Sequence, residues 1–292
     1  MAMVVELPLE TYKGPVDPDW CPGCGDFGVL RALQRAVGKL GIHPKDLMIV
    51  SGIGCSSNLP GYMHAYGFHG LHGRALAQAT GMKLANHDLH VVITGGDGDG
   101  YGIGVQHFIH AMRRNLDLTY VVMNNQIYGL TTGQASPTTE RGDWTKSTPS
   151  GCPEESLNPL AMALVCGATY VARGFSGEQD HLTALIAEGI RHKGFALIDV
   201  FSPCVTYNKH NTYQWFKDKI YKLEEADYTP TDYERALGKA REWEEHIPIG
   251  LLYQLSRPTY EDGEPALRQG PLVRHQLGLT PEQGQALLRQ FM

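Results

Sequence analysis

Two cysteines separated by two residues, Cys21 and Cys24, lie near the start of the chain in the segment PDWCPGCGDFG. A C-x-x-C pair is typical of a bound metal, an iron–sulfur cluster or a redox disulfide. Two thiolates supply only half of a tetrahedral ligand set. If the pair binds a metal, further ligands must come from elsewhere in the chain.

The chain has six cysteines in all, so four compete for the remaining positions. Cys166 lies in the apolar run LAMALVCGATYV and is expected to be a core thiol. Cys152 lies in the polar loop STPSGCPEES, with no partner nearby in the sequence. Cys55 and Cys204 each directly follow an apolar, strand-like run. The coherent ligand set is therefore Cys21, Cys24, Cys55 and Cys204.

Four thiolates suit either Zn²⁺ or a [4Fe–4S] cluster. Structural zinc usually takes two local C-x-x-C pairs. Here two of the ligands come from widely separated strand ends, which favours a cluster placed beside a reaction centre. Structural zinc and a set of unconnected core cysteines are the alternatives.

A glycine-rich run, TGGDGDGYG, contains Asp97 and leads through a helical pattern to Asn125, 28 residues further on. One strand–helix–strand unit of about 30 residues brings both side chains to the same sheet edge. Their oxygens suit Mg²⁺, and glycines let backbone N–H groups approach a diphosphate. A glycine turn without a ligand is the plain alternative. A dinucleotide loop fits less well because of the acidic residue.

Alternating strand and helix patterns are expected to position these residues. Short β-branched runs predict strands, and runs of helical period separate them. This alternation predicts an α/β fold, a parallel sheet flanked by helices on both faces, with ligands at the carboxyl ends of the strands. The expected strands are 47–53, 90–96, 118–125, 168–174 and 195–203, and the expected helices are 27–40, 73–86, 103–114, 158–166 and 178–192.

Three parts of the chain differ in character. Residues 1–20 read as an N-terminal arm, and residues 21–204 hold the strand–helix alternation with every motif described above. Residues 205–292 are charged and punctuated by proline, and they read as a helical extension that makes a subunit contact.

Composition excludes several classes of protein. A formal net charge of −6 and a pI near 6.1 argue against a nucleic-acid partner. The N-terminus has neither the basic nor the apolar region of a signal peptide, and no apolar run is long enough for a membrane span. Scattered cysteines indicate a reducing compartment, so we expect a cytoplasmic protein with no membrane partner.

The G-D-G and N-N segments at this spacing resemble the binding motif of thiamine diphosphate enzymes. By that resemblance, Asp97, Asn125 and the main-chain carbonyl of Ile127 ligate Mg²⁺, which bridges the cofactor's diphosphate. The segments WCPGCG, GIGCS, HGLHGRALAQATGMKLAN, NNQIYGLTTGQASPTT and SPC also resemble the β-subunit of 2-oxoacid:ferredoxin oxidoreductases. This resemblance covers about residues 18 to 210.

The resemblance implies a thiamine diphosphate-binding fold with one [4Fe–4S] cluster on the four cysteines. Among the histidines of HAYGFHGLHGR, His64 and His69 lack metal-ligand spacing, whereas His72 matches the HGR segment of the family. The implied cofactor contacts are Ile53, Gly54, Cys55, Ser56, His72, Gly73, Gly96, Gly98, Asp99, Asn125, Gly129 and Leu130.

The implied reaction is the reversible oxidative decarboxylation of a 2-oxoacid, with coenzyme A taking the acyl group and ferredoxin the electrons. In reverse it fixes CO₂, as in the reductive tricarboxylic acid cycle. Thiamine enzymes need a glutamate that activates the cofactor ring, and we find no module for it here. The resemblance therefore implies an α-subunit partner in an αβ or α₂β₂ complex. We favour 2-oxoglutarate as substrate; pyruvate, a non-oxidative thiamine enzyme with structural zinc, and a non-catalytic cofactor-binding subunit are the alternatives.

Overall fold

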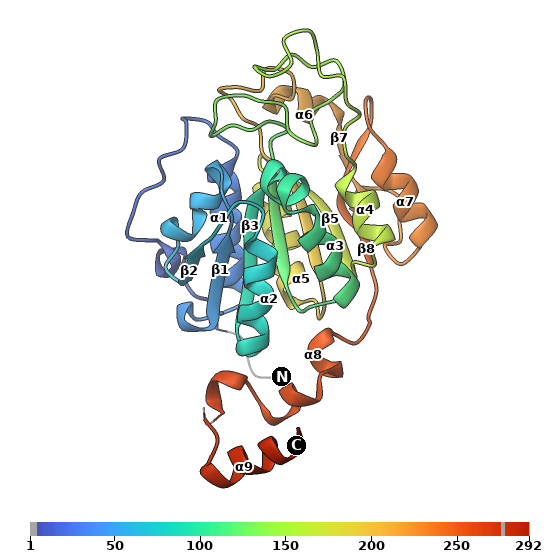
Figure 1. The fold of residues 1–292 in the computed structure, drawn as a ribbon. Coiled ribbons are helices and arrows are strands. Elements are labelled where there is room, and N and C mark those ends of the chain that lie inside the picture. Colours follow the sequence, from blue (N-terminus) through green and yellow to red (C-terminus); the bar gives the residue numbers. More distant parts are fainter. Residues whose placement is uncertain (1–4, 276–277, 292) are drawn as a thin grey trace.

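The computed structural model describes residues 5–275 and 278–291, and these contain one eight-stranded sheet (Figure 1). The sheet order is β2-β1-β3-β4-β6-β5-β8-β7. All neighbouring pairs are parallel except β5 with β8. The predicted α/β class is therefore confirmed. The strands are β1 Leu47–Ser51, β2 Tyr66–His69, β3 His90–Gly96, β4 Thr119–Asn124, β5 Tyr170–Phe175, β6 Ala196–Phe201, β7 Ile220–Lys222 and β8 Ile247–Gln254.

Helices cover both faces of the sheet. α1 Asp26–Lys39 and α5 Gln179–Arg191 pack on one face, where Ile49, Val92 and Val121 belong to the same core cluster. The opposite face carries the next residues of the same strands, and the helices packed there are α2 Ala75–Ala85, α3 Val105–Arg114, α4 Pro159–Val165 and α7 Tyr233–Arg241. The central strands are thus buried on both sides, which explains their continuous apolar runs.

The segment after residue 204 does more than form helices. It contributes α6 Tyr213–Lys219, and its strand β8 pairs with both β5 and β7. These two strands were not expected from the charged, helical character of the segment. Farther on, α8 Tyr260–Gly263 and α9 Pro281–Arg289 lie below the sheet in Figure 1. The subunit-contact role of residues 205–292 remains a proposal. Residues 1–4 of the arm, together with 276–277 and 292, lie outside the described residues.

Short helical turns occupy many of the connections. They are η1 Leu9–Tyr12, η2 Pro44–Asp46, η3 Cys55–Tyr62, the π-helix η4 Gly98–Ile103, η5 Leu223–Glu225, η6 Pro265–Gln269 and η7 Leu272–Arg274. Two of them, η3 and η4, come soon after β1 and β3 and themselves contain predicted site residues. None of the described helices is long and apolar enough to cross a membrane.

Register aligns the carboxyl ends of the central strands. Ser51 pairs with Thr94 two residues before the end of β3, and Gly96 pairs with Met123. Asn124, the last residue of β4, pairs with Phe201, the last residue of β6. The loops that follow β1, β3, β4 and β6 therefore leave the sheet along one edge, where the predicted site residues meet.

Candidate active site at the carboxyl edge of the sheet

The four cysteines of the predicted ligand set line one cavity of about 220 Å³, together with Asn125 and Gly129. They come from the segment before α1, from the start of η3 and from the turn after β6. A Cβ built on Gly129 would lie 3.7 Å from the Sγ atoms of both Cys55 and Cys204. A glycine here leaves room beside those sulfurs. The structure thus brings together cysteines that lie far apart in the sequence.

Local packing fixes this cavity. Trp20, directly before the C-x-x-C pair, donates from Nε1 to the carbonyl oxygen of Cys55 over 2.7 Å. Its ring meets Phe27 and Tyr62 edge-on, with centroids 5.3 and 4.9 Å away. The cavity wall is therefore anchored to α1 and η3. Trp20 is not among the residues predicted for the site, although its position next to Cys21 was a usable signal.

Two thiols of the cavity, those of Cys24 and Cys55, are partly buried near the Asp26 carboxyl group. Burial raises the pKa of Cys55 to about 11, and burial followed by the nearby Asp26 raises the pKa of Cys24. Asp26 is itself buried; its Oδ1 accepts from Ser202 Oγ over 2.6 Å, and burial raises its pKa to about 6. With their pKa values raised, the Cys24 and Cys55 thiols keep their protons at neutral pH unless a metal displaces them. This environment disfavours a reactive, exposed thiolate.

The four thiols form the candidate donor set for a metal centre. Within the described residues, no three His, Cys, Asp or Glu side chains are arranged to hold a single metal ion. A lone zinc needs its sulfurs gathered at about 2.3 Å from one point. The four thiols line a cavity of about 220 Å³, and their chemistry suits a [4Fe–4S] cluster as well as Zn²⁺.

Asp97 marks the end of β3 and precedes the π-helix η4. Its carboxyl group is buried, and Thr138 Oγ1 lies 2.7 Å from Oδ2. Burial raises the pKa of Asp97, while hydrogen bonds from Ser136, Thr138 and the Asn125 backbone lower it. Because a π-turn is frequent at functional sites, its position after Asp97 agrees with a binding role.

Gly98 must be a glycine because of close packing. A Cβ at this position would lie 2.6 Å from Cζ of Tyr128, whose hydroxyl donates to the Gly98 carbonyl oxygen over 3.1 Å. Gly96 has a similar constraint, since its Cβ would lie 3.2 Å from Ser56 Oγ. The glycines thus bring η3, η4 and the loop after β4 together around one backbone cradle.

Asn125 lies in both the cysteine cavity and the segment of the predicted magnesium ligands. Its Oδ1 accepts the backbone N–H of Ile127 over 3.1 Å, and its carbonyl oxygen accepts from Asn208 Nδ2 over 3.0 Å. Gln126, between them, has a left-handed backbone with φ of 58°. This turn places Asn125 and Ile127 side by side, and Asn125 also lines the cysteine cavity together with Leu130.

Asp99 ties three segments together. Its Oδ1 accepts the backbone N–H groups of Ile53 and Gly73 over 2.9 and 2.8 Å, and lies 2.6 Å from His72 Nδ1. Its Oδ2 is buried and has no hydrogen-bond partner among the described residues. Gly54, the residue after Ile53, has a φ of 134°, a backbone conformation that only glycine adopts readily. Asp99 therefore holds the predicted cofactor segments in place, and its direct contact with a cofactor remains a proposal.

The other candidate residues lie outside this site. Cys166 is half-buried at the end of α4 and packs against the second core cluster, whereas Cys152 is buried in the loop after β4. His69 is exposed on β2, and His64 Nδ1 lies 2.9 Å from the carbonyl oxygen of Thr11. None of these four residues lines the cysteine cavity.

Three polar residues behind Asp97 were missed: Asn124, Thr138 and Asp199. Asp199 is 1% exposed in the middle of β6, and Arg173 is its neighbour on β5. A charged residue inside each of the apolar runs ATYVARG and FALIDVF was the available signal. Thr138 and Asn124 lie in the segment NNQIYGLTTGQASPTT, which carried the family resemblance but gave neither residue a role.

This fold and site define a class, that of thiamine pyrophosphate enzymes: their C-terminal TPP binding domain matches residues 52–200. The C-terminal part of the pyruvate ferredoxin oxidoreductase β-subunit matches residues 204–269. The chain belongs to the β-subunits of 2-oxoacid:ferredoxin oxidoreductases, so it is one subunit of a multi-subunit oxidoreductase.

Relatives support this membership over most of the chain. The 2-oxoacid:ferredoxin oxidoreductase 1 subunit β of Aeropyrum pernix is 48% identical over 265 residues, covering 87% of this chain and 83% of that protein. The 2-oxoglutarate synthase subunit KorB of Methanocaldococcus jannaschii is 41% identical, covering 82% and 89%. The solved 2-oxoglutarate:ferredoxin oxidoreductase of Magnetococcus marinus, with 2-oxoglutarate, coenzyme A and succinyl-CoA bound, matches with a TM-score of 0.90 and 41% identity over 96% of each chain.

Proposed function

We propose that the chain, with an α-subunit, catalyses the reversible, coenzyme A-dependent oxidative decarboxylation of 2-oxoglutarate. The substrate loses CO₂, its acyl group forms a thioester with coenzyme A, and a pair of electrons leaves singly through a [4Fe–4S] cluster to ferredoxin. Bound thiamine diphosphate supplies the electron sink for decarboxylation. The chain's own residues bind the cofactors and place them next to each other.

One observation carries this proposal. The cavity lined by Cys21, Cys24, Cys55 and Cys204 also contains Asn125 and Gly129, which belong to the thiamine motif. A cluster in this cavity therefore lies against the cofactor segment without an intervening element. Cys55 and Cys204 follow separate strands, which supports a cluster over structural zinc, whose ligands usually come as two local C-x-x-C pairs.

For the magnesium site, the proposed ligands are Asp97, Asn125 and the carbonyl oxygen of Ile127. All three follow strands β3 and β4 at the same edge of the sheet. Oxygen donors of this kind suit Mg²⁺, which also retains oxygens of a bound diphosphate. The proposed diphosphate cradle comprises Ile53, Gly54, Ser56, His72, Gly73, Gly96, Gly98 and Asp99, whose segments meet through the carboxylate of Asp99.

An α-subunit is proposed to complete the site. The side chain of His72 is 32% exposed, and the apolar residues Leu71, Ile103 and Leu130 on the flanking segments are 70%, 49% and 53% exposed. Such uncovered apolar side chains beside a cofactor edge fit a subunit contact. We expect the partner to supply the activating glutamate and most contacts with the 2-oxoacid and coenzyme A.

The preference for 2-oxoglutarate draws support from the relatives named for it and from the Magnetococcus marinus enzyme, which holds 2-oxoglutarate. Relatives named for 2-oxoacids in general favour a second candidate, a broader specificity that includes pyruvate. Ferredoxin reduction by the purified complex, measured with 2-oxoglutarate and with pyruvate, distinguishes the two.

The experiment for the reaction itself uses the αβ complex with Cys204→Ser and Cys166→Ser. Cys166 lies away from the cavity and is the matched control. We expect Cys204→Ser to lose iron and ferredoxin reduction, while Cys166→Ser retains both. Full ferredoxin reduction by Cys204→Ser, or the absence of 2-oxoacid-dependent reduction in the wild-type complex, contradicts the proposal.

A further inference from the structure

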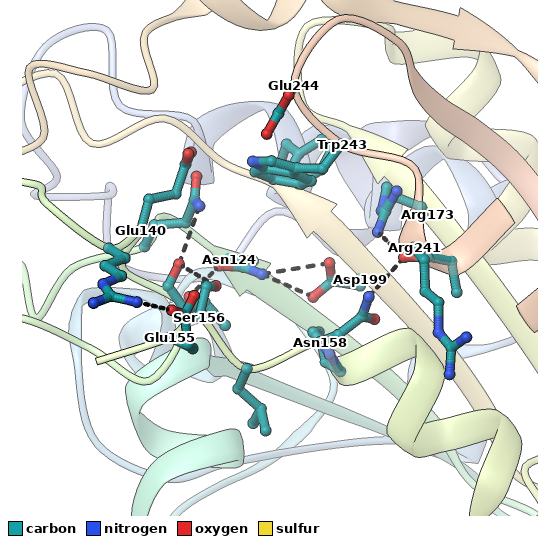
Figure 2. Close-up of a pocket in the computed structure, with 17 residues that line it drawn as sticks. Asn124, Glu140, Glu155, Ser156, Asn158, Arg173, Asp199, Arg241, Trp243 and Glu244 are labelled. Atoms are coloured by element: carbon teal, nitrogen blue, oxygen red, sulfur yellow. Dashed lines mark hydrogen bonds and ion pairs between the residues drawn. The ribbon is translucent and has the colours of Figure 1, made fainter. Parts of the chain in front are cut away.

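Behind Asp97, a line of buried polar side chains runs away from the cofactor edge. Thr138 Oγ1 lies 2.7 Å from Asp97 Oδ2 and 2.9 Å from Asn124 Oδ1. On its other side, Asn124 Nδ2 donates to Asp199, with 3.2 Å to Oδ1 and 3.4 Å to Oδ2. In Figure 2 the side chains of Asn124 and Asp199 point toward each other, and Arg173 lies on the far side of Asp199 from Asn124. Asp97, Thr138, Asn124 and Asp199 are all at most 4% exposed.

Asp199 determines which way the Asn124 amide points. A carboxylate accepts but cannot donate, so the amide nitrogen of Asn124 must face Asp199 and its oxygen must face Thr138. Tyr101 also donates to Asp199 Oδ1, over 2.8 Å. Arg173, paired with Asp199 in the strand register, supplies a buried cation within reach, 5.3 Å from the ring of Phe201. The orientation of Asn124 therefore depends on Asp199.

Thr138 has one hydroxyl proton and two close side-chain acceptors, Asp97 Oδ2 and Asn124 Oδ1, while Ser136 Oγ lies farther away at 3.4 Å. The hydrogen bond to the Asp97 carboxylate is favoured, because charge-assisted hydrogen bonds are the stronger ones. Asn124 Oδ1, which Asp199 holds toward Thr138, lies 2.9 Å from the hydroxyl oxygen on its far side and keeps Oγ1 between the two residues. Thr138 thus holds Oδ2, one of the two oxygens of the Asp97 carboxylate.

We propose that Thr138, Asn124 and Asp199 are positioning residues that orient Asp97 for its divalent cation. The inference rests on the proposed magnesium–thiamine site and deepens it. Outer partners of metal ligands typically change metal affinity by about 10- to 100-fold when they are removed. The same loss is expected here when the Thr138 hydroxyl or the Asp199 carboxylate is removed.

The test measures Mn²⁺ affinity by electron paramagnetic resonance in the αβ complex with thiamine diphosphate present. Thr138→Val keeps the shape but removes the hydroxyl, and we expect affinity to fall by about 10- to 100-fold. Thr138→Ser restores the hydroxyl and is expected to bind nearly as the wild type does. Thr183→Val is the matched control, since Thr183 is fully buried in α5 and, among the described residues, its hydroxyl bonds only to the Gln179 carbonyl oxygen of the same helix.

A substitution of Asp199 provides a second, independent test. It lines a cavity of about 360 Å³ that also contains Asn124 and Thr138 (Figure 2). In Asp199→Ala, formate can enter from that cavity and replace the missing carboxylate. We expect Mn²⁺ affinity to fall and to recover with formate, whereas formate leaves Thr138→Val unchanged.

The outcomes separate the two proposals. If the wild-type complex shows no cation-dependent binding of thiamine diphosphate, the proposed function fails. If the wild type binds but Thr138→Val binds Mn²⁺ as tightly as Thr138→Ser, the positioning role is overturned. A folded Asp199→Ala with wild-type affinity removes Asp199 from the set. If Asp199→Ala does not fold, the comparison of Thr138→Val with Thr138→Ser alone decides whether the positioning role holds.

Discussion

Replacing Asp99 by alanine is expected to loosen three segments of the cofactor edge at once. The Asp99 carboxylate accepts backbone N–H groups from Ile53 at 2.9 Å and Gly73 at 2.8 Å, and it contacts His72. A hydrogen bond to a charged acceptor contributes about 1.5–3 kcal/mol. Its loss corresponds to about 10- to 150-fold faster local opening at each amide, since 1.4 kcal/mol is about a factor of ten.

Hydrogen–deuterium exchange of the αβ complex measures this opening directly. Peptides that contain Ile53 and Gly73 should exchange faster in Asp99→Ala by that factor, and Asp99→Asn should give a smaller effect because it keeps a neutral acceptor. Asp180→Ala is the control, because Asp180 is 87% exposed and pairs with Arg35 on the surface. Unchanged exchange at both amides in Asp99→Ala would refute the role of Asp99 in joining these segments.

Three other perturbations give separate tests. Gly98→Ala should lower thiamine diphosphate affinity, measured by calorimetry, because its Cβ would lie 2.6 Å from Cζ of Tyr128; unchanged affinity contradicts the close packing. Burial raises the pKa of Asp199 from 3.8 to about 6. Its contribution to stability is therefore full below pH 3.8 and is lost as pH rises through about 6. Thermal melting should show Asp199→Asn gaining up to about 3 kcal/mol over the wild type across that range; parallel pH profiles contradict this. Trp20→Phe removes the 2.7 Å hydrogen bond to the Cys55 carbonyl oxygen, and the cluster's visible absorbance should fade faster in air; equal decay argues against an anchoring role.

The central strands were predictable because they are buried on both faces. Such strands are continuous apolar runs in the sequence. Because ligands gather at the carboxyl ends of parallel strands, the sequence alone predicts that Cys55, Cys204, Asp97 and Asn125 lie at one edge of the sheet. The edge strand β2 was not predictable in the same way, since all four of its residues are exposed and leave no apolar pattern. Strand β8 was missed because its surroundings in the sequence are charged.

The positioning residues show where sequence reasoning stops. Thr138 lies 41 residues from Asp97, in a loop whose path depends on tertiary contacts such as the hydrogen bond from Thr139 Oγ1 to the Gln126 carbonyl oxygen. Local pattern carries no information about such a path. The buried charges of Arg173 and Asp199 were visible as exceptions in apolar strands, but their partners were not.

The central claim is that the four cysteines hold an iron–sulfur cluster beside the thiamine site. Anomalous diffraction from crystals of the αβ complex, recorded on both sides of the iron absorption edge, tests it most directly. The account predicts a compact iron peak enclosed by Cys21, Cys24, Cys55 and Cys204, adjacent to Asn125 and Gly129. A peak that appears only at the zinc edge, or a cavity closed by a disulfide, would contradict it.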